Sequence, residues 1–210
     1  MSRNLLGLIL LGLFVSLGFS SCAEDTKIED PRANWKERNE IYLDSIVNVA
    51  RNAPAGETWR IYKNYKLEVS DKFPEFFEYD SVYVKYISPV LSEEYKEKER
   101  PTAKDTVSLY YQGYLMNGER FDGNYTGKLN LDVHTPVKFV VDEVIVGLST
   151  VLQNMVEKEQ VEAYIPYQMA YGREGHDITI PGYSVLKFEI YLEKIIHPKG
   201  PDDRSRASKK

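Results

Sequence analysis

Cysteine and histidine are scarce in this chain, which has one cysteine, Cys22, and three histidines among 210 residues. A single cysteine excludes an intramolecular disulfide. The histidines, His134, His176 and His197, are far apart and lack the short, regular intervals of a metal-binding motif. We therefore expect neither a metal site nor a cofactor.

Positive charge is not in excess either. The chain has 27 Lys and Arg residues against 32 Asp and Glu residues, a formal net charge of −5. A surface that binds nucleic acid needs a basic patch or a basic excess, so we expect no nucleic-acid partner. The hydrophobic fraction of 42% and the charged fraction of 28% fit one globular domain with extensions.

The prominent hydrophobic run is confined to the N-terminus, from Leu5 to Phe19 after the basic Arg3. It is shorter than the roughly 20 residues that a membrane-spanning helix needs. A basic residue, a short apolar run and a pair of small residues are typical of a secretory signal peptide. We expect residues 1–21 to be that signal peptide, removed on export.

Cys22 follows Ser20 and Ser21, and this arrangement resembles a bacterial lipobox. The resemblance implies that the Cys22 thiol is acylated and anchors the chain in the envelope of a Gram-negative bacterium, in its outer membrane on the periplasmic or the surface face. The acidic stretch 23–25 resembles an export signal of Bacteroidetes lipoproteins. The alternative is an ordinary signal peptide that leaves Cys22 free.

Residues 22–80 are expected to form a tether and an N-terminal helical extension. Asp30-Pro31 is typical of a helix start. The apolar residues that recur at helical spacing beyond it are Trp35, Tyr42, Ile46 and Val49. They predict an amphipathic helix over residues 32–52, which either packs on the adjacent core or binds a partner.

The C-terminal half predicts an α+β domain over residues 81–197. Alternation and β-branched or aromatic content predict strands at 81–88, 107–115, 119–122, 138–141, 160–166 and 186–193. Asn117-Gly118 favours a tight hairpin turn, and apolar spacing predicts a short helix over 148–155. We expect an antiparallel half-barrel sheet wrapped on this helix. The tail 198–210 is expected to be disordered.

Three motifs in this half resemble the FKBP-type peptidyl-prolyl cis/trans isomerase family. The first is YYQGYLMNGERFD at residues 110–122, the second is IPYQMAYG at 165–172, and the third combines Gly175-His176 with Ile180-Pro181. Their joint order is more specific than any one motif. The resemblance covers residues 81–196.

The resemblance implies an apolar cradle for a prolyl ring. The matching positions are Tyr111, Phe121 and Phe188 for the walls, Leu148 for the floor, Val144 and Ile145 for the rim, and Asp122, Tyr171, His176 and Ile180 around the mouth. In the family, the backbone N–H at the Ile145 position and the hydroxyl at the Tyr171 position bind substrate carbonyls. Taken singly, the apolar members could equally be ordinary core residues, and His176 a surface histidine.

Two departures from the family pattern concern the cradle. Leu148 stands where the family has a tryptophan, and Val137 aligns with a wall position that is usually aromatic. The sequence therefore predicts an envelope isomerase that acts on X-Pro bonds of exported or envelope polypeptides, with weak activity. The alternative is a non-catalytic FKBP-like chaperone or structural binding module.

Overall fold

The structure, a computed structural model, describes residues 30–54, 58–67, 78–88 and 98–200. The expected signal peptide, Cys22 and residues 201–210 of the expected tail lie outside the described residues. The chain divides after Ala33 into two compact units. In the first, the described residues 30–33 form a turn in which the Asp30 carboxylate accepts the Arg32 N–H at 2.9 Å.

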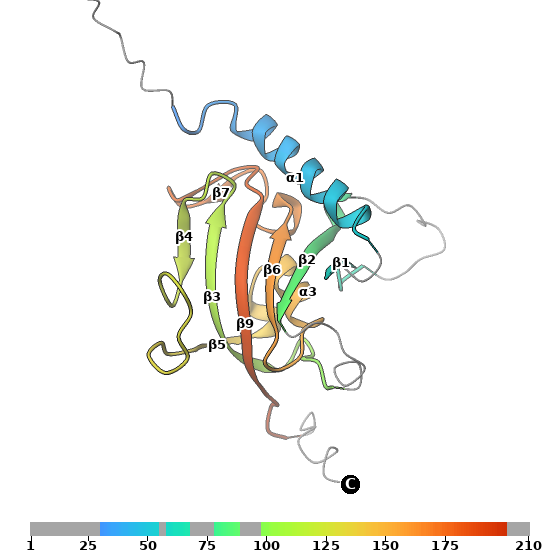
Figure 1. The fold of residues 1–210 in the computed structure, drawn as a ribbon, viewed down its shortest axis with the longest axis vertical. Coiled ribbons are helices and arrows are strands. Elements are labelled where there is room, and N and C mark those ends of the chain that lie inside the picture. Colours follow the sequence, from blue (N-terminus) through green and yellow to red (C-terminus); the bar gives the residue numbers. More distant parts are fainter. Residues whose placement is uncertain (1–29, 55–57, 68–77, 89–97, 201–210) are drawn as a thin grey trace, which may run out of the picture. The chain divides into compact units, whose positions relative to one another are not determined.

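The second unit is built from one large antiparallel sheet with a helix on each face (Figure 1). Its helical elements are α1 (Trp35–Arg51), η1 (Glu78–Asp80), η2 (Val141–Glu143), α3 (Val146–Leu152) and η3 (Tyr167–Met169). Its strands are β1 (Trp59–Lys63), β2 (Ser81–Ser88), β3 (Thr106–Leu115), β4 (Arg120–Gly123), β5 (Val137–Val140), β6 (Gln160–Ile165), β7 (Gly175–His176), β8 (Ile180–Pro181) and β9 (Leu186–Ile196).

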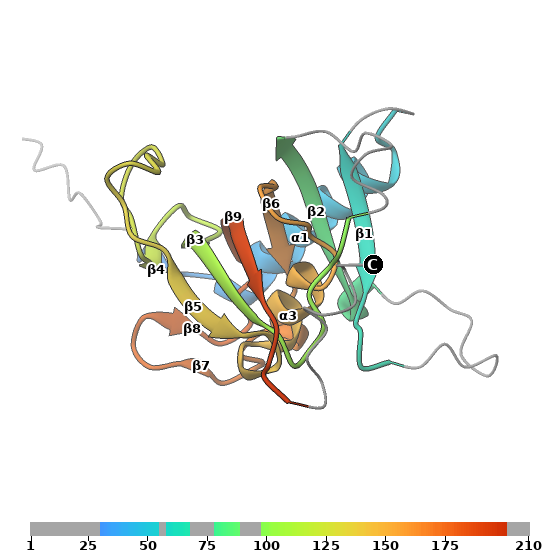
Figure 2. The same cartoon turned by 90° about the horizontal axis from the view of Figure 1, so that it is seen from below.

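Seven strands form the main sheet, in the order β1-β2-β6-β9-β3-β4, and β5 pairs with β3 as well. Every pairing is antiparallel, and Figure 2 follows the curved sheet from β4 across to β1. The short strands β7 and β8 pair separately as a small hairpin. The expected α+β architecture, an antiparallel sheet wrapped on a short helix, is confirmed.

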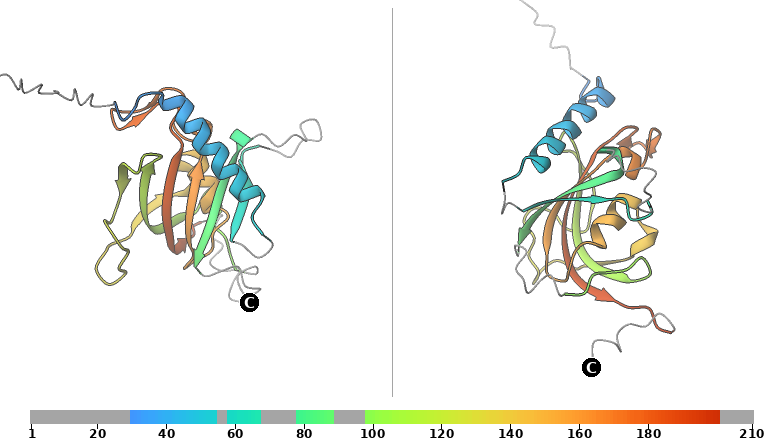
Figure 3. Two further views of the ribbon diagram at one scale, coloured as in Figure 1. Left: turned by 45° about the horizontal axis from the view of Figure 1, so that its top comes forward. Right: turned by 90° about the vertical axis from the view of Figure 1, so that its right-hand side faces the viewer.

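The core lies on both faces of this sheet because the two helices cover opposite sides (Figure 3). The main cluster joins α3 to the inner faces of β2, β3, β6 and β9. A smaller cluster under α1 contains Leu43, Val47, Tyr83, Tyr164 and Val185. Strand β9 alternates buried and half-buried residues from Leu186 to Glu193, which is the pattern of a half-buried antiparallel strand.

Helix α1 differs from the sequence expectation at its start and on its buried face. It begins at Trp35 after Asn34, which is left-handed with φ 52°, because Asp30 is used inside the preceding turn and does not cap it. The fully buried stripe is Trp35, Asn39, Leu43 and Val47, whereas Val49 is 50% exposed. The buried face therefore carries a polar residue that the apolar pattern did not include.

The sheet also extends beyond the boundary expected at Ser81. Strand β1 pairs with β2 from Trp59↔Lys85 to Lys63↔Ser81, so part of the expected helical extension belongs to the sheet. Strand β1 has no clear alternation of burial, which explains why its sequence gave no strand signal. Within the described residues, no helix is both long and apolar enough to cross a membrane.

Candidate active site

A pocket of about 320 Å³ opens between the inner face of the sheet and the start of α3. Its lining residues come from β3, β4, β5, β9, the segment before α3, α3 itself and the loop after η3. They are Tyr111, Phe121, Asp122, Phe139, Glu143, Val144, Ile145, Leu148, Tyr171 and Phe188. Segments far apart in the sequence thus contribute to one mostly apolar concavity.

The walls are aromatic rings packed edge to face. The Tyr111 ring lies 5.6 Å from the Phe139 ring at 73°, and the Phe121 ring lies 5.6 Å from the Phe188 ring at 90°. Such edge-to-face pairs are favoured by the ring quadrupole. They fix the wall in shape before any ligand enters.

Gly113 is what lets two of these rings lie so close to β3. A Cβ at this position would meet the Phe121 ring at 2.6 Å and the Phe188 ring at 3.1 Å. Any other residue would push Phe121 outward, because real Cβ atoms do not approach to 2.6 Å. The glycine of the YYQG motif therefore has a packing reason at the pocket.

The floor is aliphatic. Leu148, in the first turn of α3, is 6% exposed and belongs to the main core cluster. The neighbouring Gly147 allows α3 to approach β6, since a Cβ there would collide with Ile165. The floor is thus tied to the sheet and is not free to shift with a ligand.

Hydrogen-bonding groups stand at the mouth. The Tyr111 hydroxyl donates to Oδ2 of Asp122 at 2.7 Å, and Oδ1 of Asp122 accepts the Gly123 N–H at 2.7 Å. Burial, and next the hydrogen bond to Asp122, raise the pKa of Tyr111. Both carboxylate oxygens of Asp122 are thus held in place by hydrogen bonds that they accept.

Tyr171 and Ile145 offer donors toward a ligand. Burial raises the pKa of Tyr171, and the negative charges of Asp122 and Asp177 raise it further, so its hydroxyl keeps its proton at neutral pH. Ile145 is the residue before α3 and has extended angles, φ −54° and ψ 145°, so its N–H lies outside the helical ladder. Both residues expected to bind substrate carbonyls line the pocket.

The structure brings most of the predicted site residues to this pocket but leaves two outside its lining. His176, on β7, stacks on the Tyr171 ring at 4.7 Å between centroids and 14° between planes. Ile180, on β8, pairs with His176 and is 3% exposed in the main core. These two support the loop that carries Tyr171.

Two lining residues, Phe139 and Glu143, were missed by the sequence reasoning. The aromatic wall contributed by β5 is Phe139, while Val137 is half-buried beside the core. Residues two apart on a strand share a face, so the expectation that Val137 lies in the wall already placed Phe139 on the same side of the strand. Glu143 carried no signal of its own, since exposed glutamates are common.

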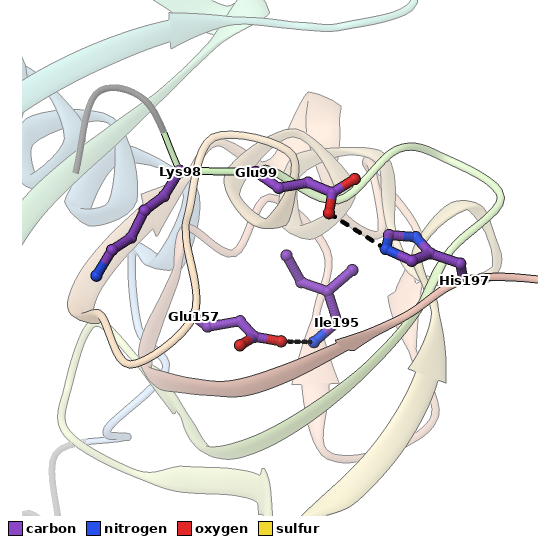
Figure 4. A pocket seen from close by; sticks show the side chains of 5 residues that line it. All are labelled: Lys98, Glu99, Glu157, Ile195 and His197. Carbon is purple, nitrogen blue, oxygen red and sulfur yellow. Dashed lines mark hydrogen bonds and ion pairs between the residues drawn. The ribbon is translucent and has the colours of Figure 1, made fainter. Parts of the chain in front are cut away.

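A second, smaller cavity lies at the far end of β9 (Figure 4). It measures about 190 Å³ and is lined by Lys98, Glu99, Glu157, Ile195 and His197. Glu99 reaches the His197 ring at 3.2 Å, and Glu157 accepts the Ile195 N–H at 2.7 Å. These pairings fix the end of the strand.

Across the described residues, no group of three or more His, Cys, Asp and Glu side chains could hold a metal ion.

Comparison with known sequences agrees with this geometry. Residues 97–193 match the profile of the family described as FKBP-type peptidyl-prolyl cis-trans isomerase. The chain is 36% identical over 99 residues to the macrophage infectivity potentiator of Trypanosoma cruzi, covering 47% of each chain. It is 35% identical over 94 residues to the isomerase FkpA of Escherichia coli K12, covering 45% of this chain and 32% of that protein. The matches thus span less than half the length of these relatives.

Solved structures with the same fold include a peptidyl-prolyl cis-trans isomerase of Pseudomonas syringae, with a TM-score of 0.53 and 21% identity over 80% of this chain and 98% of that one. The structure of E. coli FkpA gives the same TM-score with 22% identity, over 78% of this chain and 62% of that one. At such identities the likeness shows the fold alone. The sequence profile is what shows that residues 97–193 form a domain of the FKBP-type peptidyl-prolyl cis-trans isomerase family.

Proposed function

We propose that this protein is a peptidyl-prolyl cis/trans isomerase that acts on X-Pro bonds of exported or envelope polypeptides. The observation that carries the proposal is the aromatic pocket with the Tyr171 hydroxyl and the Ile145 N–H at its mouth. Relatives that carry the isomerase name support it. The family acts on proline-containing peptides, which are the substrate class proposed for this chain.

The pocket suits the physics of the reaction. Rotation about an X-Pro bond is slow because amide resonance gives the C–N bond partial double-bond character, with a barrier of about 18–20 kcal/mol. The twisted transition state has lost this resonance, and its carbonyl is less polar. An apolar pocket therefore binds the twisted amide better than the planar one. No nucleophile or proton transfer is required.

The groups at the mouth have the role of holding the flanking peptide still. Donors from Tyr171 and Ile145 would bind carbonyls on either side of the rotating bond, so that rotation is confined to one amide. Asp122, fixed by Tyr111 and Gly123, would orient the peptide entering the mouth.

The test is isomerisation of a short X-Pro peptide by the purified full chain. Phe121→Ala, which removes a wall, and Tyr171→Phe, which removes a donor, should each lower kcat/KM by on the order of tenfold or more. Tyr164→Phe is a matched control, because Tyr164 lies in the smaller cluster under α1 and not in the pocket. It should leave turnover unchanged.

One observation favours a second candidate, a non-catalytic binding module: the floor residue is Leu148 where the family has an aromatic ring. Less aromatic surface weakens the grip on a prolyl ring. A full chain that binds proline peptides in this pocket without accelerating isomerisation would support that alternative and contradict the enzyme.

We also propose that Cys22 is acylated and anchors the protein to a membrane of the cell envelope, the outer membrane being favoured. The support is the order of Arg3, the apolar run 5–19, the serine pair and Cys22. Cys22→Ala should release the protein from membranes or leave its signal peptide uncleaved. A processed variant that still fractionates with the outer membrane would contradict this anchor.

A further inference from the structure

The N-terminal half of α1 is joined by hydrogen bonds to the segment between β8 and β9. Oδ1 of Asn39 accepts the Val185 N–H at 2.8 Å, and Nδ2 of Asn39 donates to the Trp35 carbonyl at 2.8 Å. The Trp35 indole N–H donates to Oγ of Ser184 at 3.0 Å, and Ser184 in turn donates to the Pro181 carbonyl at 2.6 Å. We call Trp35, Asn39, Ser184 and Val185 the helix anchor.

These bonds are more specific than ordinary helix packing. Asn39 is 1% exposed, and a buried amide is costly unless its donors and acceptors find partners. Leu43 and Val47, on the same stripe, make only apolar contacts, which allow small shifts of the helix along the sheet. A directional bond to the main chain of a segment 146 residues away fixes the position of that segment.

The anchored segment leads directly to Tyr171. The Tyr183 N–H donates to the Gly172 carbonyl at 3.0 Å, and the Gly175 N–H donates to the Tyr171 carbonyl at 3.2 Å. Gly175 and His176 pair with Pro181 and Ile180 in the β7–β8 hairpin. The His176 ring stacks on the Tyr171 ring. A continuous series of contacts therefore runs from α1 to the pocket.

From this series we infer that α1 is a positioning element of the active site, and that Asn39 and Trp35 are positioning residues which hold the Tyr171 hydroxyl at the pocket mouth. The inference rests on the proposed isomerase function. The helix lies outside the part of the chain that matches the family, residues 97–193, so its contribution is an addition to the family pocket. Misplacement of a binding group by about 1 Å can cost up to 100-fold in rate.

The test compares Asn39→Leu, which keeps side-chain bulk and removes both hydrogen bonds, with Val47→Ala. Val47 packs in the C-terminal half of α1, in the same cluster as Val185, but takes part in none of the anchor's hydrogen bonds, so its variant controls for lost apolar packing and stability. Asn39→Leu should lower kcat by on the order of tenfold, whereas Val47→Ala should lower the unfolding midpoint without changing kcat. Trp35→Phe, which removes the indole N–H together with part of a buried ring system, is a second variant with the same expected direction.

The same changes in a Tyr171→Phe background show whether the anchor acts through Tyr171. Two residues that act through one group are not additive, so Asn39→Leu should have little further effect once the hydroxyl is gone. An equal loss in both backgrounds, or an equal loss in Val47→Ala, would overturn the inference.

Amide hydrogen exchange provides a readout that does not depend on catalysis. Exchange at Gly175 and Tyr183, whose N–H groups bond to the Tyr171–Gly172 turn, should accelerate in Asn39→Leu and in Trp35→Phe but not in Val47→Ala. Unchanged exchange at these amides would overturn the inference whatever the turnover. Accelerated exchange in a protein without turnover would support the anchor and contradict the proposed function instead.

Discussion

At the scale of single residues, the pocket combines aromatic walls with an aliphatic floor. Leu148 is nearly fully buried below the rings of Tyr111, Phe121 and Phe188, and Phe139 completes the wall on the β5 side. The walls alone can stack on a prolyl ring, but the floor offers less flat surface than an indole. At this scale we therefore expect the floor to limit the strength of binding.

Leu148→Trp is accordingly expected to raise turnover. An aromatic contact of this kind contributes on the order of 1 kcal/mol beyond area alone, which corresponds to roughly fivefold in rate. The measurement is kcat/KM for an X-Pro peptide, with the thermal unfolding midpoint as the control for correct folding. A folded variant with unchanged turnover would show that the floor does not limit the reaction.

Glu159 is a buried carboxylate away from the pocket, 1% exposed, with its Oε2 accepting the Val156 N–H at 2.8 Å. Burial raises the pKa of Glu159 above its ordinary value of 4.5, although the hydrogen bond from Val156 opposes this shift. Because the folded-state pKa is raised, the protonated Glu159 side chain favours the folded protein over the unfolded one. This contribution to the free energy of unfolding is fully present below pH 4.5 and is lost as the pH rises through the folded-state pKa.

Wild type should therefore gain stability relative to Glu159→Gln as the pH falls from neutral toward 4.5. The measurement is the difference in unfolding midpoint between the two proteins at several pH values. Glu174→Gln, at an exposed position, controls for the loss of one negative charge. A difference that does not change with pH would contradict the burial of a charged Glu159.

At the scale of elements, helix α1 shows what apolar periodicity can and cannot predict. The helix itself was predicted from the spacing of Trp35 and the residues after it, but its buried face was not. The buried Leu43 and Val47 are apolar and were passed over for their neighbours, whereas Asn39 counts as polar in any such pattern. Its burial depends on the Val185 N–H, a partner that is close only in three dimensions. Long-range satisfaction of a polar group cannot be seen in a local pattern.

Strand β3 gives a sharper expectation at this scale. A methyl group at Gly113 would press on the Phe121 and Phe188 rings, so Gly113→Ala should displace Phe121 and deform the wall between β3, β4 and β9. Overpacking of this kind costs about 1–3 kcal/mol of folding free energy. We expect a lower unfolding midpoint and a loss of turnover larger than that of the control Tyr164→Phe.

Gly113→Ala also separates two explanations of the glycine. Gly113 does not have a positive φ, so its backbone conformation does not itself require glycine, and a strand would accept alanine here at a modest cost if packing allowed it. Unchanged turnover and stability in this variant would contradict the close packing of the rings on β3.

At the scale of the whole molecule, the long strands β2 and β9 could be predicted from the sequence. The edge strand β1 and the short strands β7 and β8 could not. Strands β2 and β9 were recognised from alternation, and the Asn117-Gly118 turn appears with Gly118 at φ 83°. Strand β1 has no alternation, and β7 and β8 have two residues each, too few for any period. The pocket was predictable because its residues lie in ordered motifs, and Phe139 was missed although it shares a face of β5 with Val137.

The central claim is that one pocket both binds proline peptides and speeds their isomerisation. Exchange NMR on an X-Pro peptide with a small amount of the full chain tests both parts in one experiment. We predict faster cis/trans exchange with the protein than without it, together with shifted resonances of Tyr111 and Phe188 on adding peptide. Shifted resonances with exchange no faster than in the free peptide would contradict the account, because the pocket would then bind proline without catalysis.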